Sequence, residues 1–96
     1  MKLEFHPEAE TEYLEALSHY EAQLAGLGKR LEADVRTAEK LLLDYPQIGA
    51  SLGGGLRKLV LAAFPYYLIY SIKGGVISVL ALAHEKRRPG YWSART

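Results

Sequence analysis

The residues most able to do chemistry lie near the C-terminus, in the stretch HEKRRPGYW at positions 84–92. Three consecutive cations, Lys86, Arg87 and Arg88, are followed by a Pro-Gly turn and then by Tyr91 and Trp92. Cations beside aromatic rings are suited to phosphate contact and base stacking. Arg, Tyr and Trp are also the usual anchors of protein interfaces. The stretch therefore predicts a contact surface for a polyanion or an acidic partner.

Two further cations, Arg57 and Lys58, lie in a predicted strand, where consecutive side chains point to opposite faces. One of them is expected to join the C-terminal cations, and the sequence leaves open which one. His84 ends the last predicted strand beside those cations, and we interpret it as a structural histidine in preference to a general base. The chain has no cysteine, and its histidines and carboxylates lack metal-ligand spacing, so we predict no metal and no cofactor.

Charge is distributed unevenly between the two halves of the chain. Residues 1–48 contain five Lys/Arg against ten Asp/Glu, and residues 49–96 contain seven against one, within a net charge of +1. This separation predicts one acidic surface and one basic surface on a single folded body, the basic one facing an anionic partner.

The hydrophobic pattern changes from a helical to a strand period along the chain. An apolar stripe begins after Pro7 and is interrupted by AGLG at 25–28, and a second stripe ends at Pro46, which predicts a helical hairpin. Gly74-Gly75 is a turn signal between two strands. The last strand is almost entirely apolar, so we expect it to be internal in the sheet. The expected strands are 2–6, 56–64, 66–72 and 76–83, and the expected helices are 7–24 and 29–45.

These elements predict one α+β domain over residues 1–96, in the order β-αα-βββ, with the helical hairpin packed on one face of a small, mostly antiparallel sheet. The segment SLGGG at 51–55 is expected to be a flexible lead-in to the sheet. The N-terminus has no apolar leader and no run reaches the length of a membrane span. We therefore expect a cytoplasmic protein that does not contact a membrane.

Several of these stretches together resemble the RelE/ParE superfamily of type II toxin–antitoxin toxins, which includes plasmid stabilisation proteins. They are FHPEAETEYLEAL, AGLG, DYPQIG, LRKLVLAAFPYYLIYSI and VLALAHEKRRPGYW, and they cover nearly the whole chain. The resemblance implies a compact toxin that a cognate antitoxin neutralises by wrapping an acidic or amphipathic segment around it. RelE-like members cut mRNA in the ribosomal A site without a metal, whereas ParE-like members lack that catalytic set and inhibit DNA gyrase.

The resemblance implies a catalytic set for a RelE-like ribonuclease that this chain carries only in part. Lys58 matches a basic position, but Val60 and Tyr67 stand where such enzymes carry a lysine and an arginine. Several cations must stabilise a dianionic phosphorane, and losing one costs about 100-fold in rate. Arg57, Arg88 or His84 can substitute for the missing cation. The catalytic candidates for this activity are Lys58, Arg87, Arg88 and Tyr91.

The leading prediction is therefore a ParE-like toxin that inhibits growth by binding DNA gyrase. One alternative is a ribosome-dependent mRNA endonuclease, so whether the protein is an enzyme stays open. Another alternative is an inactive toxin homologue that serves as a binding module. The residues predicted to contact the target or the antitoxin are Arg57, Lys86, Arg87, Arg88, Tyr91 and Trp92.

Overall fold

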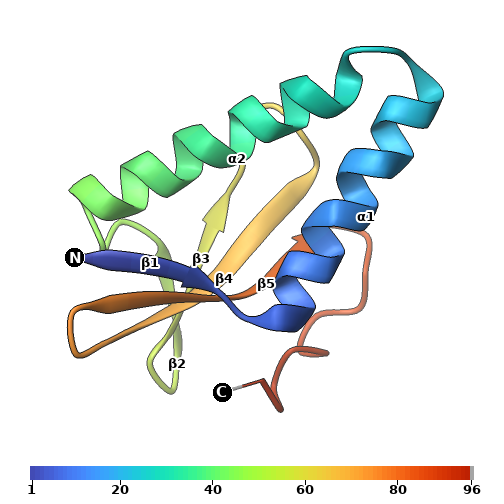
Figure 1. Ribbon diagram of the computed structural model, residues 1–96. Coiled ribbons are helices and arrows are strands. Elements are labelled where there is room, and N and C mark those ends of the chain that lie inside the picture. Colours follow the sequence, from blue (N-terminus) through green and yellow to red (C-terminus); the bar gives the residue numbers. More distant parts are fainter. Residues whose placement is uncertain (96) are drawn as a thin grey trace.

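Two helices pack against one face of a five-stranded mixed sheet, as Figure 1 shows for the computed structural model, which describes residues 1–95. The elements are β1 (Lys2–Phe5), α1 (Pro7–Gln23), α2 (Leu27–Asp44), β2 (Ala50–Gly53), β3 (Leu56–Val60), β4 (Tyr66–Lys73) and β5 (Val76–His84). The predicted α+β class and the helical hairpin are confirmed. Neither helix has the combination of length and apolarity that crossing a membrane requires.

The strands are ordered β1-β5-β4-β3-β2 across the sheet. β1 runs parallel to β5, and the other neighbours are antiparallel. The apolar strand β5 therefore lies between two neighbours, as its composition predicts. The main core fills the space between helices and sheet, and its largest fully buried side chains include Tyr70, Leu31, Leu42 and Leu68.

Local capping explains where the two helices begin. Pro7 occupies the first turn of α1, and the Nδ1 atom of His6 accepts a hydrogen bond from the Glu8 amide at 3.1 Å. α2 has no side-chain cap of its own. The Glu21 carboxylate of α1 instead accepts from the amides of Gly26 and Gly28, each at 3.0 Å, and these bonds lower the pKa of Glu21.

One strand differs from the prediction, because residues 50–53 form β2 instead of a flexible lead-in. Every residue of β2 is exposed, so the strand has no hydrophobic pattern to reveal it. Backbone pairing with β3 holds it, with Ala50 opposite Lys58. Gly53, Gly54 and Gly55 all have positive φ, which lets the chain turn back into β3.

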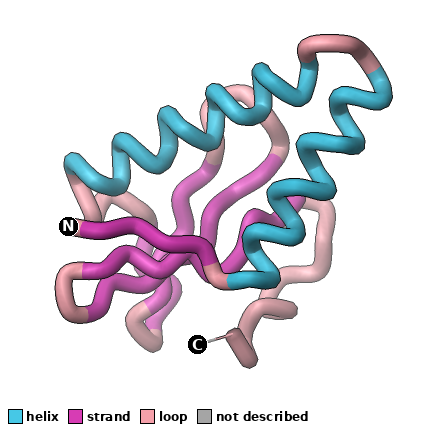
Figure 2. The backbone as a smooth tube through the Cα atoms, viewed as in Figure 1, coloured by secondary structure: helices cyan, strands magenta, loops and turns pink. Residues whose placement is uncertain are grey.

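β5 contains a bulge that shifts the direction of its side chains. Ile69 of β4 pairs with Ala81 and Tyr70 pairs with Val79, which leaves Leu80 as the extra residue. Leu80 and Ala81 therefore both face away from the helices, into a second, smaller apolar layer. Residues 85–95, which we name the C-terminal strap, cover this layer as an irregular segment, seen as the pink C-terminal tube in Figure 2.

Candidate functional site

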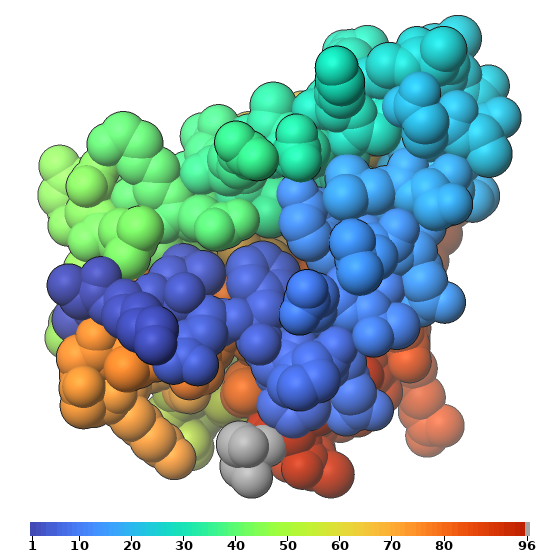
Figure 3. Space-filling model, viewed as in Figure 1, coloured from blue at the N-terminus to red at the C-terminus, as the bar shows by residue number. Residues whose placement is uncertain are grey.

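The carboxylate of Glu12, on α1, binds two arginines of the C-terminal strap. Its Oε1 accepts a hydrogen bond from Nη1 of Arg95 at 2.8 Å, and its Oε2 accepts one from Nη1 of Arg87 at 3.2 Å. The side chains of Glu12 and Arg95 are only 11% and 10% exposed. Arg95 also reaches Glu8 at 3.3 Å, and Figure 3 shows the red C-terminal atoms against the blue start of α1. Removing one partner of an ion pair this buried costs stability, because the other charge is left buried and unpaired.

The same contacts complete the hydrogen bonding of β5. β1 pairs with β5 only as far as Val79, so the next part of that edge has no strand beside it. There the Glu12 carboxylate accepts from the Leu82 amide at 3.2 Å, and the Leu80 carbonyl accepts from Arg95 at 3.1 Å. The two side chains thus satisfy backbone groups that a neighbouring strand would otherwise bind.

Both arginines also contact the ring of Tyr91. The guanidinium carbon of Arg87 lies 3.5 Å from the ring centroid, and that of Arg95 lies 5.0 Å away. The Tyr91 hydroxyl is buried and has no hydrogen-bond partner among residues 1–95. Burial, followed by the adjacent Glu12 carboxylate, raises the pKa of Tyr91.

The environment of Arg95 keeps its guanidinium charged. Burial lowers the pKa of Arg95, but the hydrogen bond and the charge of Glu12 outweigh that effect and raise the pKa above its usual value. The cation is therefore a permanent partner for the carboxylate, and the pair cannot be released by losing the arginine proton.

Trp92, which is predicted to contact the target or the antitoxin, packs in the second apolar layer. It is 6% exposed and packs edge-on against Tyr67, with ring centroids 5.9 Å apart. Tyr67, Ile69, Leu80, Ala81 and Ala83 form the floor beneath it. Its ring is therefore unavailable to a partner while the strap is in place.

Arg57 and Lys58 lie on opposite faces of the sheet. Arg57 shares a face with the helices, where Nη1 donates to the carbonyls of Gln47 at 3.1 Å and Gly49 at 2.8 Å. Lys58 lies on the strap side, with Nζ 4.3 Å from the ring centroid of Tyr67. Lys58 is thus the member of the pair that shares a face with the strap.

The expected separation of acidic and basic surfaces holds only in part. Two acidic residues of α1 reach the C-terminal strap and bind Arg87 and Arg95. Lys86 and Arg88 remain exposed and form no ion pair within residues 1–95. The basic surface is consequently smaller than the sequence predicts. In the strap, Lys86 and Arg88 are the cations that are exposed and unpaired within residues 1–95.

Sequence reasoning missed Glu12 and Arg95, although one signal was present. Glu12 follows Ala9 by three residues and precedes Ala16 by four, and both alanines are buried. An acid on the apolar stripe of a helix requires a partner. That partner lies 83 residues away in the sequence, and no local pattern identifies it.

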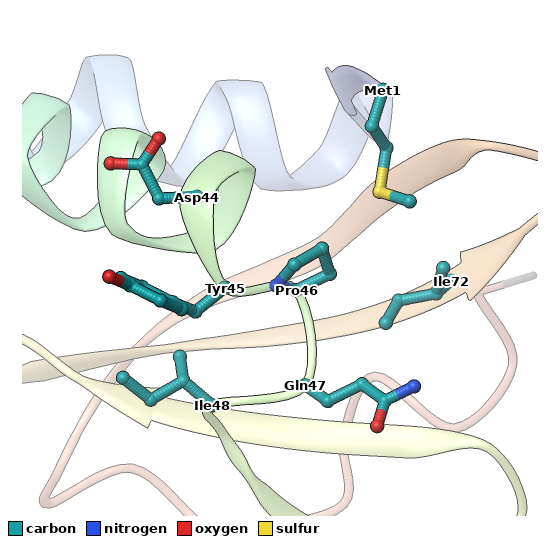
Figure 4. Close-up of a pocket in the computed structure, with 7 residues that line it drawn as sticks. All are labelled: Met1, Asp44, Tyr45, Pro46, Gln47, Ile48 and Ile72. Atoms are coloured by element: carbon teal, nitrogen blue, oxygen red, sulfur yellow. The ribbon is translucent and has the colours of Figure 1, made fainter.

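A cavity at the other end of the sheet offers little chemistry. It has a volume of about 530 Å³ and is lined by Met1, Asp44, Tyr45, Pro46, Gln47, Ile48 and Ile72. In Figure 4 the Asp44 carboxylate points away from Met1 and Ile72, and it pairs with Lys40 at 3.0 Å. Within the described residues, no group of three or more histidines and carboxylates is placed to hold a metal ion.

Comparison with known proteins identifies the family. Residues 3–89 match the family described as "ParE toxin of type II toxin-antitoxin system, parDE". The chain therefore belongs to the ParE family of type II toxins, which confirms the predicted superfamily. A solved structure described as "Chromosomal ParDE TA system from P. aeruginosa" is similar, with a TM-score of 0.70 and 28% identity over 88% of this chain and 95% of that chain. No curated protein matches the chain.

Proposed function

We propose that this toxin arrests growth by binding DNA gyrase and that a cognate antitoxin neutralises it. The family match supports a toxin of the ParE type. The description of the similar structure as a toxin–antitoxin system supports a protein partner of the antitoxin class. Positive charge on the C-terminal strap would speed the encounter with an acidic segment of such a partner.

The geometry of the four catalytic candidates favours binding over RNA cleavage. Cleavage needs several cations and a proton-transfer group around one phosphate. Here Arg87 is bound to Glu12 and stacked on Tyr91, while Lys58 lies over another ring. The observation that carries the preference is the buried Tyr91 hydroxyl, because a substrate cannot exchange a proton with a group that it cannot reach.

Lys86 and Arg88 are the residues of the strap best placed for target contact. Both are exposed and neither is bound to a carboxylate in residues 1–95. Arg87 and Tyr91 stay in the predicted contact surface through their exposed parts. The Nη1 atom of Arg57 donates to two backbone carbonyls, so its predicted role in binding falls to Nε and Nη2.

The test measures inhibition of gyrase supercoiling by the purified protein. Lys86→Ala combined with Arg88→Ala should weaken inhibition by about threefold to thirtyfold, the range for removing two exposed charge contacts of about 0.3–1 kcal/mol each. Lys73→Ala is the matched control, because this exposed cation lies at the hairpin between β4 and β5. The cognate antitoxin should restore supercoiling.

Other outcomes in cells would replace the proposal. Induction of the toxin alone should cause double-strand breaks and an SOS response. Rapid loss of translation with codon-phased mRNA cuts, while gyrase stays active, would instead identify the ribosome-dependent endonuclease. Normal growth after verified expression would identify an inactive homologue.

A further inference from the structure

The C-terminal strap is held to the rest of the protein almost entirely through side chains. The Glu85 amide donates to the Pro65 carbonyl at 2.9 Å, where the chain leaves β5. Beyond that point, the Arg87 amide donates to the carbonyl of His84, the last residue of β5, at 2.9 Å, and the backbone bonds of Ser93 and Arg95 are turns within the strap. The strap therefore has no strand or helix ladder to keep it in place.

Side chains of the strap make most of its attachments, Tyr91 packs beside Trp92, and two arginines converge on one carboxylate. Trp92 fills the second apolar layer, and Arg87 and Arg95 both bind Glu12. Arg95 gains further bonds to Glu8 and to the Leu80 carbonyl. Removing the charge of Glu12 thus weakens both charged attachments in one step.

Packing beneath the strap is incomplete. A cavity of about 260 Å³ lies between the strap and the sheet, and its lining includes Leu56, Leu80, Trp92 and Arg95. Gly90, with a φ of 87°, makes the left-handed turn that places Trp92 in the second apolar layer. A segment with a ladder-free backbone and a void beneath it opens at a lower free energy than the main core.

We propose that Glu12 is a positioning residue that keeps the C-terminal strap closed, and that loss of its charge opens the strap while the helices and sheet stay folded. Opening releases Arg87 and Arg95 from the carboxylate and brings Trp92 to the surface. The cations and rings predicted from the sequence as one contact surface are then presented together. The inference does not depend on the identity of the target.

Fluorescence of Trp92 provides a direct test, because the chain has a single tryptophan. Acrylamide quenching is compared among the wild-type full-length chain, Glu12→Gln and Glu15→Gln, with far-UV circular dichroism recorded on each sample. Glu15 is the matched control because it lies three residues further along α1, is exposed and makes no ion pair within residues 1–95. Hydrogen exchange of residues 85–95 is measured beside that of β4.

Glu12→Gln should raise the population of the open strap by about tenfold to a hundredfold. This ratio corresponds to the free energy of one hydrogen bond to a charged group. Quenching of Trp92 and exchange of the strap should rise together, while circular dichroism and β4 exchange stay at wild-type values. Glu15→Gln should change none of them. Arg87→Gln and Arg95→Gln should have a smaller effect in Glu12→Gln than in the wild type, because the bonds to Glu12 are then already weakened. The remaining effect reports the bonds of Arg95 to Glu8 and Leu80 and the contacts of both arginines with Tyr91.

Two results would overturn the proposal. One is a Trp92 that stays as shielded in Glu12→Gln as in the wild type. The other is quenching that rises only in step with loss of circular dichroism, which would mean that Glu12 supports the whole fold. If Glu12→Gln does not fold, the pair Arg87→Gln and Arg95→Gln is judged by the same criteria, since it keeps the Glu12 hydrogen bond to Leu82.

Discussion

Replacing Asp34 should destabilise the protein far more than replacing any exposed acid. Asp34 is a buried charged residue of α2, 9% exposed. Its Oδ2 accepts hydrogen bonds from the amides of Ala63 at 3.0 Å and Phe64 at 2.9 Å. These bonds fix the loop between β3 and β4, and Pro65 of that loop in turn binds the base of the strap.

The magnitude follows from the two amides that Asp34→Ala leaves without a partner. A buried donor without a partner costs about 1–3 kcal/mol. Both amides are only partly buried, so we expect a loss of about 2–4 kcal/mol in the free energy of unfolding. Asp34→Asn keeps an acceptor oxygen but loses the charge, and it should cost about 1 kcal/mol. A native stability of about 5–15 kcal/mol makes either change measurable.

Urea denaturation followed by circular dichroism measures the difference. Asp44→Ala is the control, because Asp44 forms an exposed pair with Lys40 on the same helix and should cost about 0.3–0.5 kcal/mol. The order of stability should be wild type, Asp44→Ala, Asp34→Asn, Asp34→Ala. If Asp34→Ala unfolds at the same urea concentration as Asp44→Ala, the hydrogen bonds from α2 to the loop do not stabilise the fold as reasoned here.

Two further predictions concern buried tyrosines. Tyr70→Phe should cost about 1–3 kcal/mol, because the Tyr70 hydroxyl donates to the Pro46 carbonyl at 2.7 Å and accepts from the Gly49 amide at 2.9 Å. Urea denaturation measures this cost. Tyr45→Phe, at a site 63% exposed, should leave the free energy of unfolding unchanged. Burial, and then its neighbour Tyr20, raises the pKa of Tyr66 to about 12 from 10.0. The folded state therefore favours the neutral phenol, so this stabilisation is complete below pH 10 and is lost as the pH rises from about 10 to about 12. A phenolate absorbance titration should show a late component that is smaller by one tyrosine in Tyr66→Phe, because the pKa of Tyr91 is raised as well. A late component of unchanged amplitude in that variant would contradict the assignment.

The elements that could be predicted from the sequence are those with a strong hydrophobic period. α2 has an apolar stripe that is buried, and β4 and β5 are runs of mostly buried apolar residues on either side of a turn signal, so burial and secondary structure agree there. The strand β2 could not be predicted because its residues are exposed on both sides and only hydrogen bonding to β3 orders it. Tyr45 is predicted to be buried because it continues the apolar stripe of α2. In the structure it is exposed, because the helix ends there.

The candidate site was predictable in composition but not in arrangement. The sequence places cations and rings together after β5, and the structure keeps them together. Whether Arg87 is free or bound depends on Glu12, which is 75 residues distant. Such long-range pairs depend on how α1 packs on β5, and no periodicity in a single segment encodes that packing. The predicted contact residues therefore remain a prediction that the supercoiling assay tests.

The position of β1 has a consequence for how the toxin is made. Lys2 pairs with Val76, so within residues 1–95 the first strand finds its neighbour only in the last strand of the sheet to be synthesised. Until β5 emerges from the ribosome, the helical hairpin lacks the central part of the sheet against which it packs. Contacts that span nearly the whole sequence also slow folding. A nascent chain interrupted before β5 is made would thus lack the neighbour of β1 and part of both apolar layers.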